Sequence, residues 1–353
     1  MSSAFALYRL PHTDSFIRVE GDVQEVHSCE QLNGQTGFVV APFEAKPELP
    51  ILLISPQTVS SYTVAEAASD VASGAPTSSD APVPIADVSP DYHIDFANFH
   101  AQLELGIFQK IVLARCVDEP AAVGVSAEDL FMRACQLYPR MFIALVHTPK
   151  SGTWLTATPE ILLEGKGSQW RTIALAGTMK LEGEQLKGEG ESLTWSIKNI
   201  KEQRLVATYI AECLERYADD FREEGPRTVR AANLVHLCSE FSFTLPSNDS
   251  IGNLLQTLHP TPAVCGLPKR EAFRFIVGNE HTPRRYYSGF MGMLDPRGET
   301  HLYVSLRCMN IDSGFYHLYA GGGLLQDSTE QQEWQETEAK LETMRRCIAI
   351  EKA

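Results

Sequence analysis

The sequence predicts an α+β fold built on antiparallel sheets. Several short runs are rich in β-branched and aromatic residues, and many of them are joined by short loops, which is typical of sheet strands. The longest periodic segments are helical and are segregated between these runs instead of following each strand. The 353 residues are 44% hydrophobic and 21% charged, so the chain can bury a substantial core. We expect one large folded unit without internal repeats.

Composition and periodicity place the elements along the chain. Residues 67–90 are rich in Ala, Ser, Asp and Pro and lack hydrophobic periodicity, which predicts a loop. The loop ends a small N-terminal lobe, residues 1–90, which we expect to be continuous with the larger region 91–353. Residues 91–105 have the spacing of a helix. Strands are expected at residues 111–113, 142–147, 154–163, 171–175, 302–311 and 315–319.

Two longer helices are expected, at residues 193–217 and 330–350. Ser328 and Gln331 have capping-box spacing, which predicts the start of the second helix. One face of that helix begins with acidic residues and a lysine and becomes apolar further along, at Glu333, Glu336, Lys340, Met344 and Cys347. We expect this face to lie near the core throughout.

The composition argues against several classes of protein and partner. A net charge of -15 disfavours a nucleic-acid partner. No apolar run is long enough to cross a bilayer, and the first ten residues lack an export signal, so we expect a cytoplasmic protein with no membrane contact. The eight cysteines are scattered, without a C-x-x-C pair, and are expected to be reduced core thiols.

A metal site is predicted from acidic residues on the two long helices. Glu202 lies three and four residues before the core positions Leu205 and Val206, and an ionised carboxylate in a dry site needs a partner. Glutamates from separate helices, with no histidine or cysteine cluster nearby in sequence, favour a hard ion such as Mg²⁺. The alternatives are a solvated ion pair of Glu336 with Lys340, worth about 0.2–0.5 kcal/mol, and a Glu202 that pairs with a lysine or is exposed.

Further residues suit an anionic ligand or proton transfer. The sequence YAGGGLLQ, residues 319–326, places three glycines between a strand and a helix, where successive N–H groups can hold a carboxylate. Arg307 lies within the expected strand HLYVSLRCMNI and suits bidentate capture of a carboxylate. Lys110 begins the run KIVLAR, and Glu160 lies in TATPEILLEG. The alternative for the glycines is a simple turn, and that for Arg307 is a structural ion pair. Lys110 and Glu160 could each be a strand-edge charge that faces water.

The order of these pieces resembles the chorismate-utilising family. From residue 91 to the C-terminus the chain contains KIVLAR, TATPEILLEG, LAGT, the helix with Glu202, LHPTPAVCGLP, LRC, AGGG and EWQETEAK. Residues 1–90 match only loosely, as the family's variable N-terminal lobe does, while LHPTPAVCGLP most resembles isochorismate synthases. The resemblance implies two packed antiparallel β-sheets with outer helices and makes 91–353 the chorismate-binding catalytic region.

The resemblance also implies a role for each matching residue. Lys110 corresponds to the family's general base and Glu160 to its general acid. Glu202 and Glu336 correspond to direct Mg²⁺ ligands, and Glu333 to an acidic residue that reaches the ion through water. Contacts with the substrate chorismate are implied at Gly177, Thr178, His259, Arg307, Gly321, Gly322, Gly323 and Lys340.

The implied reaction is the Mg²⁺-dependent conversion of chorismate into isochorismate. Water attacks C2 while the C4 hydroxyl departs with an allylic shift of the double bond, so Lys110 must be substantially neutral and Glu160 substantially protonated. Mg²⁺ would neutralise the ring carboxylate, and Arg307 would take the enolpyruvyl carboxylate. The product would feed menaquinone or siderophore biosynthesis.

Two features favour water as the nucleophile. Ala176 stands before Gly177, where relatives that use a lysine nucleophile have Lys. The chain lacks a glutamine-amidotransferase segment, so we expect no amidotransferase partner, and a monomer or weak homodimer. The alternatives are a salicylate synthase, an anthranilate synthase component I, or an inactive chorismate-binding homologue. One local departure is Met179, Lys180 and Leu181, where relatives have an arginine-proline element.

Overall fold

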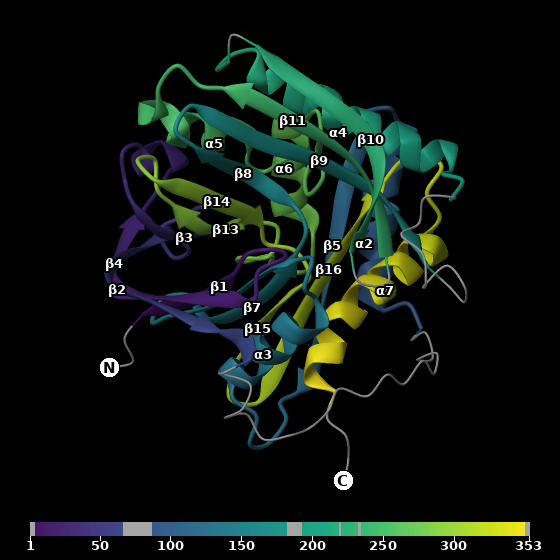
Figure 1. Ribbon diagram of the computed structural model, residues 1–353. Helices are drawn as coiled ribbons and strands as arrows, with labels where there is room; N and C mark the ends of the chain where they lie inside the picture. The colour runs from purple at the N-terminus through teal and green to yellow at the C-terminus, as the bar shows by residue number, and fades with distance from the viewer. Residues whose placement is uncertain (1–3, 66–86, 182–192, 219, 232–233, 350–353) are drawn as a thin grey trace.

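The computed structural model describes residues 4–65, 87–181, 193–218, 220–231 and 234–349. It confirms the predicted α+β class, because sixteen described strands form one antiparallel sheet with helices on its outside (Figure 1). Across the sheet the order is β10 (Phe221–Ala231), β11 (Leu234–Thr244), β9 (Gln169–Lys180), β8 (Ile161–Lys166), β14 (Glu299–Val304), β13 (Phe290–Leu294), β3 (Gly37–Ala41), β4 (Ile51–Thr63), β2 (Ser15–Val26), β1 (Phe5–Arg9), β6 (Phe142–Thr148), β7 (Gly152–Thr158), β15 (Cys308–Ile311), β16 (Phe315–Leu324), β5 (Lys110–Pro120) and β12 (Gly266–Leu267).

The sheet folds over so that its two halves pack face to face. Phe142 of β6 stacks on Tyr303 of β14, with ring centroids 4.3 Å apart, although five strands separate β6 from β14 in the sheet. The buried cluster around these rings draws apolar side chains from both halves, among them Leu175 of β9 and Tyr319 of β16. The two packed sheets that the family resemblance implies are therefore the halves of one hydrogen-bonded sheet.

The N-terminal strands are part of this sheet. β1 pairs with β6, and β3 pairs with β13, so residues 5–63 supply four strands to the middle of the order. The N-terminal strands are thus joined to the rest of the fold by strand pairing on both sides. Residues 67–86 of the predicted loop lie outside the described residues, and Ser89 caps the next helix by accepting a hydrogen bond from Tyr92 N at 3.3 Å.

Helices cover the outer faces through apolar stripes. On α4 (Ile197–Leu214), Val206, Ile210 and Cys213 recur at helical spacing and pack on β9 and β11. Two short 3-10 helices, η1 (Cys29–Leu32) and η3 (Asn248–Ser250), complete the described elements. The α-helices are α4 (Ile197–Leu214) and α5 (Ile251–Leu258) on the β9 half, α3 (Ala127–Leu137) and α7 (Glu330–Ile348) on the β6 and β16 half, and α2 (Pro90–Glu104) and α6 (Lys269–Asn279) beside β5.

Two strands expected as continuous runs are each broken in two. Within the run 154–163, β7 ends at Thr158 and β8 begins at Ile161, because Pro159 between them has no N–H to donate to a strand ladder. The run 302–311 stops at Val304 and resumes at Cys308, since the backbone of Arg307 has a left-handed φ of 44°. At both breaks the chain crosses from one half of the sheet to the other.

The predicted capping box at the start of α7 is wrong. The N-cap is Thr329, without a side-chain capping hydrogen bond. Ser328 lies one residue earlier, where its hydroxyl accepts from Leu325 N at 3.0 Å and donates to Oε1 of Glu333 at 2.6 Å. A serine expected to cap the helix therefore fixes a buried carboxylate instead.

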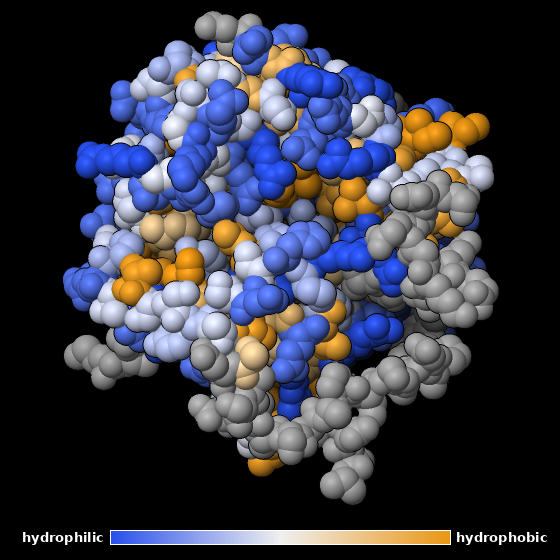
Figure 2. Space-filling view, viewed as in Figure 1, coloured by the Kyte–Doolittle hydropathy of each residue, from blue (hydrophilic) through white to orange (hydrophobic). Residues whose placement is uncertain are grey.

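The surface and the cysteines agree with the composition. The face seen in Figure 2 is largely hydrophilic, with apolar side chains in small separate patches. All eight cysteines are free thiols, and all except Cys116 are buried, as predicted. None of the helices in the described part of the chain has the length and apolar character needed to span a membrane.

Candidate active site

A cavity lies between the two halves of the sheet. Strands β9, β11 and β16 line it, together with the breaks in the run 154–163 and in the run 302–311. Of the residues predicted to form the site, those that line this cavity are Glu160, Gly177, Thr178, Glu202, Arg307, Gly321, Gly323 and Lys340. The fold therefore brings predicted site residues from six separate segments of the chain to one cavity.

The two strand breaks position Glu160 and Arg307 beside each other. Val304 N donates to the carbonyl oxygen of Glu160 at 2.9 Å, and Ala157 N donates to that of Arg307 at 3.1 Å. Each break is thus held by the strand on the other side of the crossing. Because both residues have left the regular ladder, their side chains can turn into the cavity between the halves.

Glu160 has the environment of a proton donor. Its side chain is buried, and Oε1 has no hydrogen-bond partner among the described residues. Burial raises the pKa of Glu160 to about 8, against the opposing effect of the cations Lys110, Arg307 and Lys340. This carboxyl is therefore largely protonated near neutral pH, as the proposed acid must be.

Lys110 is fully buried at the start of β5. Its Nζ lies 2.9 Å from Oε1 of Glu202, in a geometry that is not an aligned hydrogen bond. Lys110 also acts electrostatically on Glu160, so the two predicted proton-transfer residues share one environment. The alternative in which both are strand-edge charges facing water does not hold.

The three predicted metal-binding glutamates lie on α4 and α7, and each contacts a lysine. Glu202 meets Lys110, Glu336 meets Lys340 at 2.8 Å, and Glu333 meets Lys198. Both residues of the Glu336–Lys340 pair are largely shielded from water, so the alternative of a solvated surface pair does not describe them. The lysines supply the counter-charges that buried carboxylates need, and the alternative in which Glu202 pairs with a lysine therefore holds.

The protonation of the two α7 carboxylates differs. Burial and the neighbouring Glu336 raise the pKa of Glu333 to about 7. Burial alone would raise the pKa of Glu336 as well, but Lys340 holds it below its ordinary value. Oε2 of Glu333 is buried without a partner in the described structure. An unpartnered carboxylate oxygen among hard oxygen donors fits a divalent cation such as Mg²⁺.

The three glycines of β16 leave room for these charged side chains. A Cβ on Gly323 would lie 2.2 Å from Oε1 of Glu202 and 2.8 Å from Cε of Lys110. A Cβ on Gly322 would lie 3.0 Å from Oε2 of Glu333. β5 pairs with this stretch on one edge, whereas β15 ends opposite Tyr319, so the other edge has no strand partner among the described residues. That edge offers backbone N–H groups to an anion.

Arg307 is held by a histidine that sequence reasoning missed. Nε2 of His236 contacts the Arg307 guanidinium, which can only donate, while Nδ1 lies 3.0 Å from the carbonyl oxygen of Gly177. The ring therefore carries its proton on Nδ1 and accepts at Nε2. Burial and Arg307 lower the pKa of His236 well below its ordinary value, which keeps this tautomer neutral. The signal in the sequence was a lone polar residue in the apolar run LVHLC.

Two more residues differ from the prediction: His259, which was predicted to contact the substrate, and Lys198, which was not predicted. His259 does not line the cavity, because its Nε2 lies 3.1 Å from the carbonyl oxygen of Pro42 and its ring packs edge-on against Phe290. The expected substrate contact of His259 is therefore not supported. Lys198 was missed, although it lies four residues before Glu202 on α4, a spacing that places both side chains on one helix face.

Comparisons with known proteins identify the family of the chain. Residues 68–349 match the family described as "Chorismate binding enzyme". Isochorismate synthase EntC of Escherichia coli K12 is 30% identical over 238 residues, which are 67% of this chain and 61% of that protein. Isochorismate synthase MenF of the same strain is 31% identical over 248 residues, 70% of this chain and 57% of that protein. In both alignments the chain covers less than two thirds of the relative's length.

Solved structures show the same fold. A protein described as a 2,3-dihydroxybenzoate-specific isochorismate synthase, DhbC from Bacillus anthracis, superposes with a TM-score of 0.80 at 23% identity, over 98% of this chain and 95% of that one. MenF from Escherichia coli gives a TM-score of 0.79 at 23% identity, over 99% and 89% of the two chains. With its fold, its cavity and the match over residues 68–349, the chain belongs to the family of chorismate-binding enzymes.

Proposed function

We propose that the chain is an isochorismate synthase that converts chorismate into isochorismate. The observation that carries the proposal is the presence, in one buried environment, of a lysine and a carboxyl whose pKa is raised to about 8. This is the pair of groups that a reaction needs when water is activated on one side of a ring and a hydroxyl group is protonated and leaves as water from the other. The names of the relatives, EntC and MenF, support the same activity.

The cavity has cationic and N–H groups suited to a dicarboxylate. We assign the enolpyruvyl carboxylate of chorismate to Arg307, whose guanidinium is held in place by His236. The edge of β16 at Gly321 and Gly323, which no described strand pairs with, adds backbone donors. Lys340 is fixed nearby by Glu336 and by the carbonyl oxygen of Gly321. These groups let a chain of net charge -15 bind a small dianion.

Lys110 and Glu160 then divide the proton transfers. In its neutral form Lys110 takes a proton from the water that attacks C2 of the ring. Glu160 gives its proton to the C4 hydroxyl, which leaves as water while the ring double bond shifts. One water enters and one leaves, so the reaction is an isomerisation. Ala176, which lines the cavity, offers no amine to compete as nucleophile.

The glutamates of α4 and α7 are the proposed Mg²⁺ site. Glu202 and Glu336 would hold the ion directly, and Glu333 would reach it through water. When bound, the ion supplies positive charge that neutralises the ring carboxylate of chorismate. The buried oxygen of Glu333 without a partner supports this assignment. MenF of Escherichia coli and the vibriobactin-specific relative of Vibrio cholerae are both named isochorismate synthases, which supports a proposed activity that ends at isochorismate itself.

Product analysis tests the proposal. Purified protein is incubated with chorismate, Mg²⁺ and ammonium, and the products are separated by liquid chromatography. Isochorismate as the sole product supports the assignment. Salicylate with pyruvate would replace it with a salicylate synthase, and anthranilate would replace it with an anthranilate synthase. Unchanged chorismate would indicate a binding protein without activity.

A further inference from the structure

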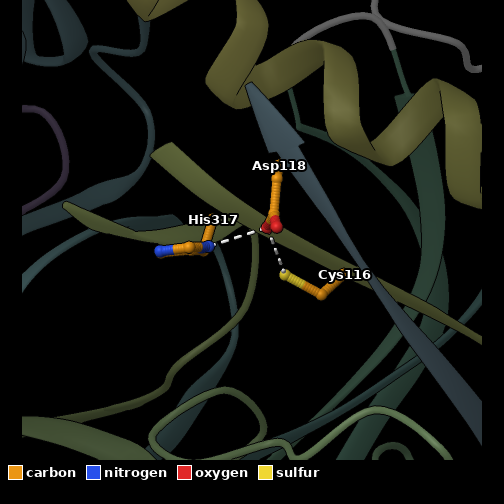
Figure 3. A group of neighbouring side chains, drawn as sticks. All are labelled: Cys116, Asp118 and His317. Atoms are coloured by element: carbon orange, nitrogen blue, oxygen red, sulfur yellow. Dashed lines mark hydrogen bonds and ion pairs between the residues drawn. The ribbon is translucent and has the colours of Figure 1, made fainter. Parts of the chain in front are cut away.

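A second group of potential metal donors lies outside the candidate active site, on strands β5 and β16. Cys116 and Asp118 are two residues apart on β5, so their side chains leave the same face. The register places Tyr319 opposite Cys116 and His317 opposite Asp118. Figure 3 shows the carboxylate of Asp118 between the thiol of Cys116 and the ring of His317.

The three donor atoms are close enough to share one ion. Oδ1 of Asp118 lies 2.7 Å from Nδ1 of His317 and 3.8 Å from Sγ of Cys116, and all three atoms are within 4.8 Å of one another. A tetrahedral zinc ion with bonds of about 2.0–2.3 Å requires donor separations of about 3.3–3.6 Å. Asp118 has a 60% exposed side chain and His317 a 25% exposed one, so both can make the small adjustment.

His317 is oriented in the way that metal-binding histidines usually are. Its Nε2 lies 2.9 Å from Oδ2 of Asp312, which leaves Nδ1 directed at the cluster. Asp312 is itself fixed, because its Oδ1 accepts hydrogen bonds from the N–H groups of Gly314 and Phe315 in the turn before β16. A carboxylate behind the ring raises the basicity of the ligating nitrogen and sets its tautomer.

The alternative without a metal is that His317 is a surface histidine that pairs with two carboxylates. The chain contains such a histidine for comparison: His301 lies 3.0 Å from Glu164 and 3.5 Å from Glu299. Among the described residues, no third donor of the required geometry joins His301, whereas a thiol joins His317.

We propose that Cys116, Asp118 and His317 form a binding site for a zinc-like divalent transition metal, with water in the fourth position. A thiolate, an imidazole and one carboxylate are donors that Zn²⁺ and Co²⁺ accept and that Mg²⁺ does not favour. Binding displaces the thiol proton and the proton on Nδ1 of His317. The ion joins β5 to β16, the strands that begin with Lys110 and end with the glycines of the candidate active site, so it should stabilise that pairing.

A cobalt titration tests the site independently of any activity. Protein in excess Mg²⁺, which occupies carboxylate sites, is titrated with Co²⁺ while the near-ultraviolet band of thiolate-to-cobalt charge transfer is recorded. The site predicts one equivalent with this band. Cys116→Ser should abolish the band, and Asp118→Asn, His317→Gln and Asp312→Asn should each weaken binding about tenfold or more. Zn²⁺ should displace the cobalt and raise the melting temperature of the unsubstituted protein but not of Cys116→Ser.

His301→Gln is the matched control and should leave the titration unchanged. Asp118 and Asp312 are exposed, so their variants are expected to fold, which far-ultraviolet circular dichroism checks. The proposal is overturned if the unsubstituted protein shows no thiolate band, or if the band survives in Cys116→Ser. It is also overturned if His317→Gln and Asp118→Asn bind cobalt with unchanged affinity, because the thiol would then act alone.

Discussion

The side-chain nitrogen Nζ of Lys110 lies 2.9 Å from Oε1 of Glu202, and both residues are buried. This contact joins the proposed general base on β5 to a proposed metal ligand on α4. Glu202 therefore has two tasks, as counter-charge to the lysine and as donor to a divalent ion. The first prediction separates these tasks by changing the lysine alone.

Lys110→Met should lower kcat by about 10²–10⁴-fold, because the water that attacks the ring loses its proton acceptor. Mg²⁺ should still bind, since Glu202, Glu333 and Glu336 are unchanged. Steady-state kinetics and isothermal titration calorimetry measure the two effects. Lys201→Met, at an exposed position on the same helix as Glu202, is the matched control and should leave both values unchanged. Near-normal turnover in Lys110→Met would remove the base from the mechanism.

Glu160 predicts a pH dependence of both activity and stability. Its pKa is raised from the ordinary 4.5 to about 8, so the acid is present below about pH 8 and kcat/KM should fall as pH rises through that value. Between pH 4.5 and about pH 8, the folded state holds this proton more tightly than the unfolded chain does. The contribution of Glu160 to stability is therefore greatest below pH 4.5 and is lost as pH rises to about 8.

Glu160→Gln tests both consequences together. The amide cannot ionise, so the variant should lose turnover and should show a smaller fall in melting temperature than the unsubstituted protein between pH 6 and pH 9. Thermal unfolding at several pH values, with activity assays in parallel, gives the comparison. A variant that keeps the alkaline loss of stability would show that another group causes it.

Lys198 is predicted to compete with a divalent ion. Its ammonium contacts Glu333 and lies among the charges of Glu336 and Glu202, where it supplies part of the charge that a metal would supply. Lys198→Met should lower the melting temperature without metal, because the buried carboxylates lose a counter-charge. The rise in melting temperature on adding Mg²⁺ should be larger than in the unsubstituted protein. A smaller rise would mean that Lys198 assists metal binding.

Gly323→Ala should disturb the site through a single methyl group. The added Cβ would meet Glu202 at 2.2 Å and Lys110 at 2.8 Å, so these side chains must move, at a cost of about 1–3 kcal/mol in stability with loss of activity. Gly278→Ala in α6 is the control, because nothing lies within 4 Å of its added methyl group. That control should be stabilised by about 0.5–1 kcal/mol with activity unchanged. Equal behaviour of the two variants in denaturant unfolding would contradict the packing described here.

Sequence periodicity predicted the longer helices α2, α4 and α7 because their apolar stripes are local, whereas the shorter helices α3, α5 and α6 were not predicted. The long helices at 197–214 and 330–348 lie within the expected ranges, and Glu333 and Glu336 share the expected face with Met344. Periodicity could not predict that the runs around Glu160 and Arg307 are broken. Each break is stabilised by a strand far away in sequence, as the hydrogen bond from Val304 to Glu160 illustrates, and no pattern within the run specifies it.

The site was predicted as a set of residues, whereas their partners required the fold. Lys110, Glu160 and Arg307 were identified, but the contact of His236 with Arg307 joins positions 71 residues apart. Ser328 looked like a helix cap in sequence and instead binds Glu333, since the capping pattern does not show which groups are buried. The tertiary fold determines which partner each of these polar side chains has, and the local sequence does not.

Isotope labelling tests the proposed chemistry most directly. The protein is incubated with chorismate and Mg²⁺ in water enriched in ¹⁸O, and the isochorismate formed early in the reaction is analysed by mass spectrometry. Attack of water at C2, with Lys110 as base and departure of the C4 hydroxyl assisted by Glu160, predicts one ¹⁸O atom in each isochorismate molecule. Unlabelled isochorismate would show that the hydroxyl migrates within the substrate, and would contradict the roles given to both residues.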